Sequence, residues 1–338
     1  MYGSRKKTIR QMLWAALAAV LCIALSITAV WAAPPPRRLI PSGQAVGIKL
    51  FADGVLVVGT SDLEGDASPA RECGLREGDQ ILRIDGEAVD STEAVQAMVA
   101  ENGTAPMELA LRRDGRYLET TIRPHRGSDG VCRLGAWIRD SMAGIGTLTY
   151  VDPATGAYGA LGHGITDVDT HRLMPLRSGS IMETRVRAVK KGAKGDPGEL
   201  KGDLTVQRDV GTLTANTDGG IFGRLSEQNP PAQALEVAAR EEVHTGPATI
   251  RATVAGSETR EYDVKIVRIW SEDRPTRNFL VEVTDPALLE ITGGIVQGMS
   301  GSPVLQDGKL VGAVTHVLVN DPTRGYGIFM ENMLAADS

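Results

Sequence analysis

Aromatic side chains are scarce in this sequence, whose 338 residues include four Phe, four Trp and six Tyr. With so few rings, the hydrophobic core must consist mostly of Val, Ile, Leu and Ala. Glycine and proline are common instead, with 39 and 17 residues. This composition predicts small β-rich domains with many tight turns rather than a helical bundle. The length suits about two such domains.

Cysteine and excess positive charge are lacking as well. The chain has three cysteines, of which Cys73 and Cys132 lie outside an apolar N-terminal run. We assign these two to different domains and interpret both as small buried residues, with no indication of a disulfide. The net charge is −6, and because residues 1–38 hold six basic residues and no acidic one, the remainder carries −12. This balance argues against a nucleic-acid partner.

One long hydrophobic run is present. Residues 12–33 are uncharged and largely apolar, about the length that spans the roughly 30 Å hydrocarbon core of a bilayer. Four basic residues precede this run, which predicts a cytoplasmic tail over 1–11, a transmembrane anchor over 12–33 and export of everything that follows. A cleaved signal peptide is the alternative. The proline-rich residues 34–43 are expected to form an extended stalk.

Residues 44–126 predict one compact domain. Ser91 is a suitable N-cap for a helix over 92–101, and Asp114-Gly115 is a strong hairpin signal. The expected strands cover 46–51, 55–59, 80–84, 107–113 and 117–123.

The segment Ser68-Pro69-Ala70-Arg71-Glu72-Cys73-Gly74-Leu75-Arg76-Glu77-Gly78-Asp79-Gln80-Ile81-Leu82-Arg83-Ile84-Asp85-Gly86 carries the most specific pattern of this domain. It resembles the central signature of bacterial PDZ domains. The resemblance implies that a loop of backbone amides captures a peptide carboxylate, and that the following strand pairs with the peptide. The residues that match this loop are Val46, Gly47 and Ile48, which become the candidate peptide-binding residues. A domain that only spaces its neighbour is the alternative.

Residues 127–338 contain short apolar segments separated by Gly, Pro and Asp turns, without a long amphipathic helix. Many strands at turn-bounded intervals predict an antiparallel barrel or sandwich of about 200 residues. The fold class is therefore mainly β, with an α+β PDZ-like domain followed by a second, larger β domain.

A candidate nucleophile lies in Gly298-Met299-Ser300-Gly301-Ser302-Pro303. A nucleophilic serine needs a tight turn where backbone amides converge on the developing oxyanion, and the two glycines permit such a turn. The pattern Gly-x-Ser-Gly-x-Pro, followed by two strands, looks like the nucleophile region of trypsin-like, chymotrypsin-fold peptidases. Ser300 is then the nucleophile, and the amides of Gly298 and Ser300 are the candidate oxyanion hole.

A serine needs a base, and His163 in Gly162-His163-Gly164 fits best because it ends a strand between two glycines. We interpret His125, His244 and His316 as structural or surface residues. A metal site is the alternative for the segment that holds His163, two aspartates and His171, but the ligands crowd one loop without a helical H-E-x-x-H motif. No metal or other cofactor is expected.

The third member should be a carboxylate that orients the base. The candidates are Asp167, Asp169 and Asp285. Asp285 ends an apolar strand shortly before the nucleophile, whereas Asp167 is only four residues from His163 and is expected to serve its own loop. The order His163, Asp285, Ser300 then follows, with Asp285 unusually near Ser300 in sequence.

The whole chain, including Gly293-Gly294-Ile295-Val296-Gln297-Gly298-Met299-Ser300-Gly301-Ser302-Pro303, resembles the stage IV sporulation protein B peptidases. The resemblance implies a double β-barrel serine peptidase whose catalytic set is His163, Asp285 and Ser300. It further implies export into the space between the two membranes of the developing spore. There the peptidase cleaves itself and a regulator of an intramembrane metalloprotease, which triggers late sigma-factor processing. The exposed, proline-rich stalk is the expected site of self-cleavage. A PDZ scaffold with an inactive peptidase domain and an envelope quality-control protease are the alternatives.

Overall fold

The computed structural model describes residues 36–65, 67–203, 208–227, 233–270 and 274–337, together with Met12 and Trp14. The chain divides into two compact units, Met1–Arg37 and Arg38–Ser338, and the second holds the folded domains. Apart from Met12 and Trp14, the predicted tail 1–11, anchor 12–33 and the start of the stalk lie outside the described residues. No helix in the part that is described is long and apolar enough to cross a membrane.

Six antiparallel strands form the first barrel, in which each strand pairs with the next and the last returns to the first. In order around the ring they are β9 (Ala136–Val151), β10 (Ala157–Ala160), β15 (Gly220–Leu225), β14 (Asp209–Thr217), β11 (Leu176–Glu183) and β2 (Ala45–Thr60). Its interior is filled mainly by aliphatic side chains, including Ile48, Leu50 and Ile181. Aliphatic side chains thus fill the space in this core that aromatic rings occupy in other proteins.

A second closed barrel follows along the chain. Its ring is β17 (Gly246–Ala255), β18 (Glu258–Ile269), β19 (Phe279–Val283), β22 (Asp321–Phe329), β21 (Lys309–Leu318) and β20 (Pro303–Gln306). A third buried cluster joins the barrels, because Leu39 and Tyr150 pack with Leu310, Ile328 and the side chains of helix α5 (Met330–Ala335). The described residues therefore form the predicted chymotrypsin-type double β-barrel.

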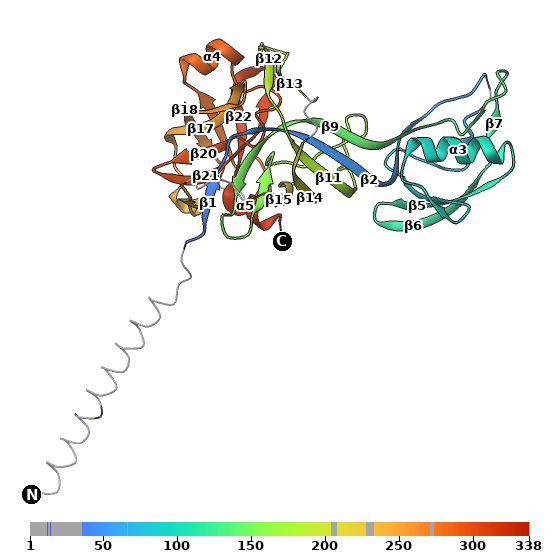
Figure 1. The fold of residues 1–338 in the computed structure, drawn as a ribbon, viewed down its shortest axis with the longest axis horizontal. Helices are drawn as coiled ribbons and strands as arrows, with labels where there is room; N and C mark the ends of the chain where they lie inside the picture. The colour runs from blue at the N-terminus through green and yellow to red at the C-terminus, as the bar shows by residue number, and fades with distance from the viewer. Residues whose placement is uncertain are drawn as a thin grey trace, which may run out of the picture. The chain divides into compact units, whose positions relative to one another are not determined.

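The PDZ domain is built on the outer ends of β2 and β9, which run side by side out of the first barrel (Figure 1). Helix α3 (Thr92–Asn102) begins and ends close to the predicted limits, and the Ser91 hydroxyl accepts the Ala94 N–H as the expected cap. The predicted hairpin through Asp114-Gly115 is confirmed. The remaining elements are α2 (Pro69–Glu72), β3 (Gln80–Ile84), β4 (Glu87–Ala88), α3 (Thr92–Asn102), β5 (Met107–Arg113), β6 (Arg116–Ile122), β7 (His125–Arg126) and β8 (Cys132–Arg133).

The structure corrects the domain boundaries expected at 44–126 and 127–338. Residues 46–51 of β2 pair on both edges with barrel strands, whereas Leu134, Ala136 and Ile138 pack against the PDZ core. Each domain therefore contains chain from both expected segments. The half-buried Cys73 and Cys132, assigned above to different domains, pack against the same PDZ core as free thiols.

The expected stalk over 34–43 is also corrected where it is described. Residues Arg38–Pro41 form strand β1, which pairs with β9 on one edge and with β16 (Leu235–Glu236) on the other. Leu39 is fully buried, and the Gly43 carbonyl accepts the Thr253 hydroxyl. This stretch is thus a structural part of the peptidase domain rather than a free tether.

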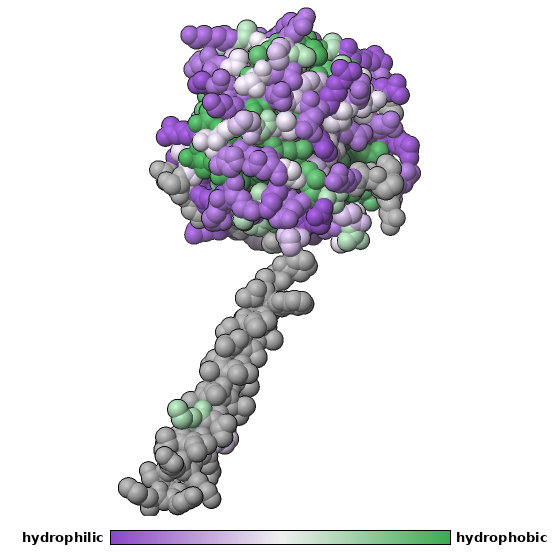
Figure 2. All heavy atoms as spheres, turned by 90° about the vertical axis from the view of Figure 1, so that its left-hand side faces the viewer, coloured by the Kyte–Doolittle hydropathy of each residue, from purple (hydrophilic) through white to green (hydrophobic). Residues whose placement is uncertain are grey.

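Short elements complete the peptidase domain: β12 (Val186–Lys190), β13 (Glu199–Gly202), a 3₁₀ turn (Arg240–Glu242) and α4 (Pro286–Thr292). Hydrophilic side chains cover most of the face shown in Figure 2, and hydrophobic residues are visible in smaller areas between them. Such a mixed surface is ordinary for a folded domain, since apolar atoms always contribute much of the accessible area.

Candidate active site

The turn that carries Ser300 lies between α4 and β20 and depends on glycine. Gly298 and Gly301 have φ angles of +98° and +95°, which favour a residue without Cβ. A Cβ on Gly301 would also collide with the Thr147 carbonyl oxygen of the first barrel. Thr147 fastens this turn, because its N–H donates to the Ser300 carbonyl at 2.9 Å and its hydroxyl donates to the Gly298 carbonyl at 2.8 Å.

Some backbone N–H groups of this turn donate hydrogen bonds to backbone carbonyls, and others have no acceptor among the described residues. The Met299 N–H donates to the Val296 carbonyl at 3.0 Å, and the Gly301 N–H donates to the Val314 carbonyl at 2.7 Å. Within the described chain, the N–H groups of Gly298 and Ser300 have no acceptor. An oxyanion hole requires free amides of this kind, here the N–H of Ser300 itself and that of Gly298 two residues before it.

His163 follows β10 at the rim of the first barrel and is half-buried. Its Nδ1 lies 2.9 Å from the Gly164 carbonyl oxygen. Because a carbonyl can only accept, Nδ1 must carry the proton, which leaves Nε2 as the basic nitrogen. Burial lowers the pKa of His163 below its usual value, the Gly164 contact opposes this, and the nearby Arg277 charge lowers the pKa further. The imidazole is therefore neutral at pH 7.

His163 and Ser300 line one cavity of about 500 Å³. Gly298 and Thr315 belong to its wall, together with apolar side chains from both barrels. The Ser300 hydroxyl donates to the Thr315 carbonyl at 2.6 Å, and no hydrogen bond joins it to His163 among the described residues. The hydroxyl must therefore turn about its Cα–Cβ bond before His163 can take its proton.

Asp285 is not part of this cavity, which corrects the expected triad. Its carboxylate caps helix α4: one oxygen accepts the N–H groups of Ala287 and Leu288 at 2.9 and 3.0 Å. The other oxygen accepts the Asp263 N–H at 3.3 Å. Since the carboxylate already serves the backbone in this way, it does not orient His163.

Substitution of Asp285 separates the two roles. We expect Asp285→Ala to lower the free energy of unfolding by about 0.5 to 2 kcal/mol, the usual cost of a lost N-cap. Asp285→Asn should change little, because Asn also caps helices well. Both variants should keep the wild-type peptidase rate per folded molecule, measured beside denaturant unfolding. A roughly 10⁴-fold loss of rate in a stable Asp285→Asn protein would restore the triad.

Asp167 and Asp169 fix the loop after His163 instead of serving as catalytic or metal-binding groups. The buried Asp167 carboxylate pairs with Arg139 of β9 and accepts the Thr170 N–H at 2.9 Å, while Asp169 meets Arg139 at 2.9 Å. Burial by itself would raise the pKa of Asp167, but hydrogen bonds from Thr170 and the Arg139 charge outweigh it and lower this pKa. The described residues contain no group of three or more His, Cys, Asp or Glu placed to hold a metal ion.

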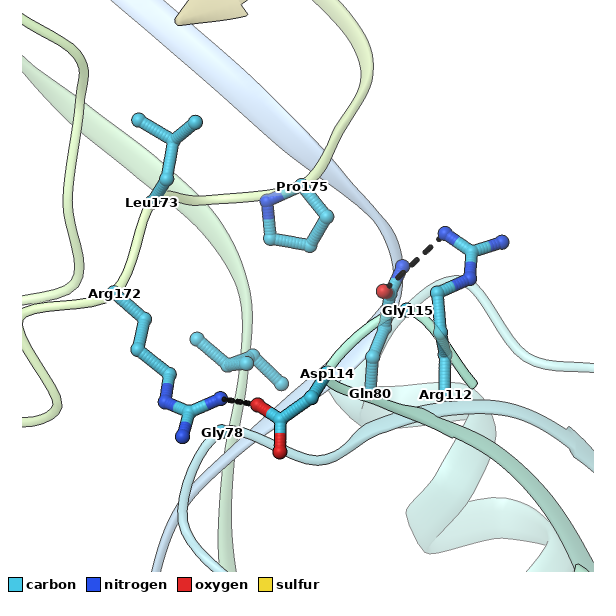
Figure 3. A pocket seen from close by; sticks show the side chains of 9 residues that line it. Gly78, Gln80, Arg112, Asp114, Gly115, Arg172, Leu173 and Pro175 are labelled. Atoms are coloured by element: carbon cyan, nitrogen blue, oxygen red, sulfur yellow. Dashed lines mark hydrogen bonds and ion pairs between the residues drawn. The ribbon is translucent and has the colours of Figure 1, made fainter. Parts of the chain in front are cut away.

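The same loop continues to the PDZ domain. Arg172 forms an ion pair at 2.8 Å with Asp114 in the turn of the β5–β6 hairpin, and its side chain lies over Gly78 (Figure 3). Arg177 of β11 pairs with Asp90 of the PDZ domain at 2.5 Å. The segment that follows His163 is thus joined to the PDZ domain by two ion pairs.

The predicted PDZ residues Val46, Gly47 and Ile48 are corrected as well. Both edges of their strand are occupied, by β9 on one side and by β11 on the other, so no peptide can add there. One edge that the described strands leave open and that lies beside α3 is Ala136–Asp140 of β9. Asp140 accepts the Thr92 N–H at 2.7 Å at the start of α3, and Trp137 is 64% exposed. This edge is the candidate peptide-binding strand.

His316 is the residue that the sequence interpretation missed. Its ring centroid lies 4.6 Å from that of His163, with 36° between the ring planes, and it lines the same cavity. The sequence could not have revealed this, because the register of the β20–β21 hairpin shifts by one residue between Val304 and Leu305. Without that shift the hairpin would place Thr315, not His316, opposite Ser300.

Comparison with known families decides the assignment. The model of the SpoIVB peptidase S55 family matches residues 130–334, which is more than half of the chain. The chain belongs to this family. A PDZ domain model matches residues 64–113. The S55 member described here is thus a serine peptidase with a PDZ domain, as predicted.

Other similarities are local. The regulator of sigma-W protease RasP of Bacillus subtilis is 36% identical over 64 residues, 19% of this chain and 15% of that protein. The chain spans roughly a fifth of the length of the curated relatives that it matches, from 15% to 29%. Among solved structures, the Rv3671c protease from M. tuberculosis in its active form has a TM-score of 0.35 at 15% identity, covering 58% of this chain and 73% of that one. The PDZ domain of the SdrC-like protein from Listeria monocytogenes has a TM-score of 0.22 at 22% identity, covering 25% and 87%.

Proposed function

We propose that Ser300 is the nucleophile and His163 the general base of a serine endopeptidase. The observation that supports this most directly is that the two side chains come from different barrels and line one cavity. Glycine-dependent backbone packing holds each of them there, since Gly301 lies against Thr147 and Gly162 lies against Thr315. A scaffold would not need this convergence.

The reaction begins when the Ser300 hydroxyl leaves the Thr315 carbonyl and donates to Nε2 of His163. The oxygen then attacks the scissile carbonyl carbon, and Nε2 takes the proton. The negative oxygen of the tetrahedral intermediate accepts the free N–H groups of Gly298 and Ser300. His163 next gives the proton to the leaving amine, and a water molecule releases the acyl group by the same steps.

The Gly164 carbonyl does for His163 what a carboxylate does in a triad. It accepts a hydrogen bond from the Nδ1–H group, with 2.9 Å between nitrogen and oxygen, and so fixes both the tautomer and the ring orientation. A neutral carbonyl stabilises the imidazolium less than a carboxylate does, because it carries only a partial charge. The catalytic unit is therefore a serine–histidine dyad aligned by the backbone.

The PDZ domain gives this peptidase a place to recognise proteins. An extended segment of substrate or regulator pairs with the open edge Ala136–Asp140, with its side chains toward α3 and Trp137. We further propose the role that the family suggests: self-cleavage, and cleavage of a regulator of an intramembrane metalloprotease during endospore formation. The enzyme acts outside the cytoplasmic membrane, anchored by residues 12–33.

Self-cleavage should occur on the N-terminal side of Arg38. Residues 38–41 are paired on both edges of β1 and Leu39 is buried, so this stretch cannot enter an active site as an extended chain without unfolding. We expect mass spectrometry of the full-length protein to find a new N-terminus before Arg38 in the wild type and none in Ser300→Ala. A first residue between Leu39 and Gly43 would contradict this prediction.

Sequencing of product N-termini also tests the function as a whole. The full chain is incubated with casein and, separately, with a peptide library, beside Ser300→Ala. A narrow set of Ser300-dependent cuts is expected. Extensive degradation of casein would favour the quality-control protease, and no Ser300-dependent cut in either substrate would favour the inactive scaffold.

A further inference from the structure

The catalytic cavity contains a second imidazole that the dyad does not use. His316 projects from β21, one residue after the Thr315 carbonyl that holds the Ser300 hydroxyl. Its ring lies against His163, with centroids 4.6 Å apart and planes 36° from parallel. This arrangement is a tilted ring contact, and no hydrogen bond joins the two rings among the described residues, where Nδ1 of His163 donates to Gly164.

Among the described residues, no carboxylate acts on the His163 and His316 rings. The groups whose charges act on the pair are the rings themselves and the Arg277 guanidinium, which repels an added proton. Asp285 and Asp167 are committed to α4 and Arg139, as shown above.

His316 is the uncharged imidazole of the pair when His163 becomes protonated. Burial, the His163 ring and Arg277 together lower the pKa of His316 to about 4. The ring is therefore uncharged near pH 7, and it does not repel the imidazolium that forms on His163. Nδ1 of His316 is buried and has no hydrogen-bond partner among the described residues, so no hydrogen bond at that atom fixes the ring. The ring instead packs against His163.

We propose that His316 is a positioning residue for His163. Its ring stacks on the imidazole and holds Nε2 toward Ser300 while Nδ1 stays on the Gly164 carbonyl. His316 neither gains nor loses a proton, since the proton passes from Ser300 to Nε2 of His163 and then to the leaving amine. This role rests on the proposed function of Ser300 and His163.

Two substitutions of His316 separate stacking from proton transfer. His316→Ala removes the stack and should lower kcat about 10- to 100-fold with KM within twofold, because a misplaced base loses roughly that much. It also lets water reach His163, so the acid limb of the kcat/KM profile should move to higher pH. His316→Phe keeps a flat ring without nitrogens and should retain kcat within about threefold, with the acid limb near its wild-type position.

Leu318→Ala is the matched control on the same strand, because this half-buried residue lies outside the cavity. It should leave kcat and the pH profile unchanged. Wild-type kcat in His316→Ala would overturn the proposal, and so would a folded His316→Phe enzyme as slow as His316→Ala, which would show that a nitrogen is required. Ser300→Ala is assayed in parallel: if it stays active, the dyad itself is wrong, whereas its inactivity beside a fully active His316→Ala refutes only the role of His316.

Discussion

Ser300→Ala and His163→Ala should each lower kcat by several orders of magnitude, on the order of 10⁶-fold where a nucleophile and its base act as one unit. The reason is that neither residue can complete the proton transfer alone. The double variant should therefore be no slower than either single variant. Rates are measured with a short peptide substrate identified by N-terminal sequencing, so that the PDZ domain does not limit turnover.

Three outcomes decide this prediction. Additive losses in the double variant would mean that Ser300 and His163 act independently. Ser300→Ala with near-normal cleavage would remove the serine mechanism altogether. Ser302→Ala is the matched control, because Ser302 lies two residues after Ser300 and is fully buried. This variant should keep most of the activity if the protein folds.

Gly301→Ala should lower peptidase activity almost as much as Ser300→Ala does. It removes no catalytic group but displaces the backbone turn that holds Ser300. Its φ of +95° disfavours a side chain, and the added methyl would collide with the Thr147 carbonyl oxygen and lie 2.5 Å from the Leu161 nitrogen. Both contacts are backbone atoms of the first barrel, which cannot move aside cheaply. The Ser300 turn must then shift away from His163, and a displacement of about 1 Å already costs on the order of 100-fold in rate.

Gly308→Ala is the control for backbone conformation. Gly308 also has a positive φ, +75°, but nothing lies within 4 Å of its hypothetical Cβ. This variant should lose about 1 kcal/mol of stability and no activity per folded molecule. Thermal unfolding and peptidase rates of the two variants are compared side by side. Equal activity in both would show that the contact between Gly301 and Thr147 does not place Ser300.

The sequence predicted the local features of the site well. The glycines around Ser300 and His163 dictate tight turns whatever surrounds them, and the signals for α3 and for the Asp114-Gly115 hairpin are short-range. The role of Asp285 was predictable too, although it was interpreted otherwise. Asp followed by Pro at the first helical position is a typical helix start, and that is the use the structure makes of it.

Long-range pairing explains the remaining differences. Ala52-Asp53-Gly54 interrupts the apolar pattern of β2 and resembles a turn, yet the strand continues from the barrel into the PDZ domain. The strands that flank Val46, Gly47 and Ile48 are β9 and β11, whose paired residues lie about 100 and 135 positions further along the chain. The local alternation of apolar and polar residues cannot specify such distant partner strands. The candidate peptide-binding edge in the structure is therefore Ala136–Asp140 instead of Val46–Ile48.

Labelling with a fluorophosphonate tests the proposed dyad most directly, because this reagent reacts with a serine only when a base activates it and an oxyanion hole receives the phosphoryl oxygen. The full-length protein is labelled and digested, and the modified residue is identified by mass spectrometry. The structure predicts one adduct, on Ser300, formed at near wild-type rate in Asp285→Asn and lost in His163→Ala. Labelling that survives in His163→Ala but disappears in Asp285→Asn would contradict a dyad of Ser300 and His163.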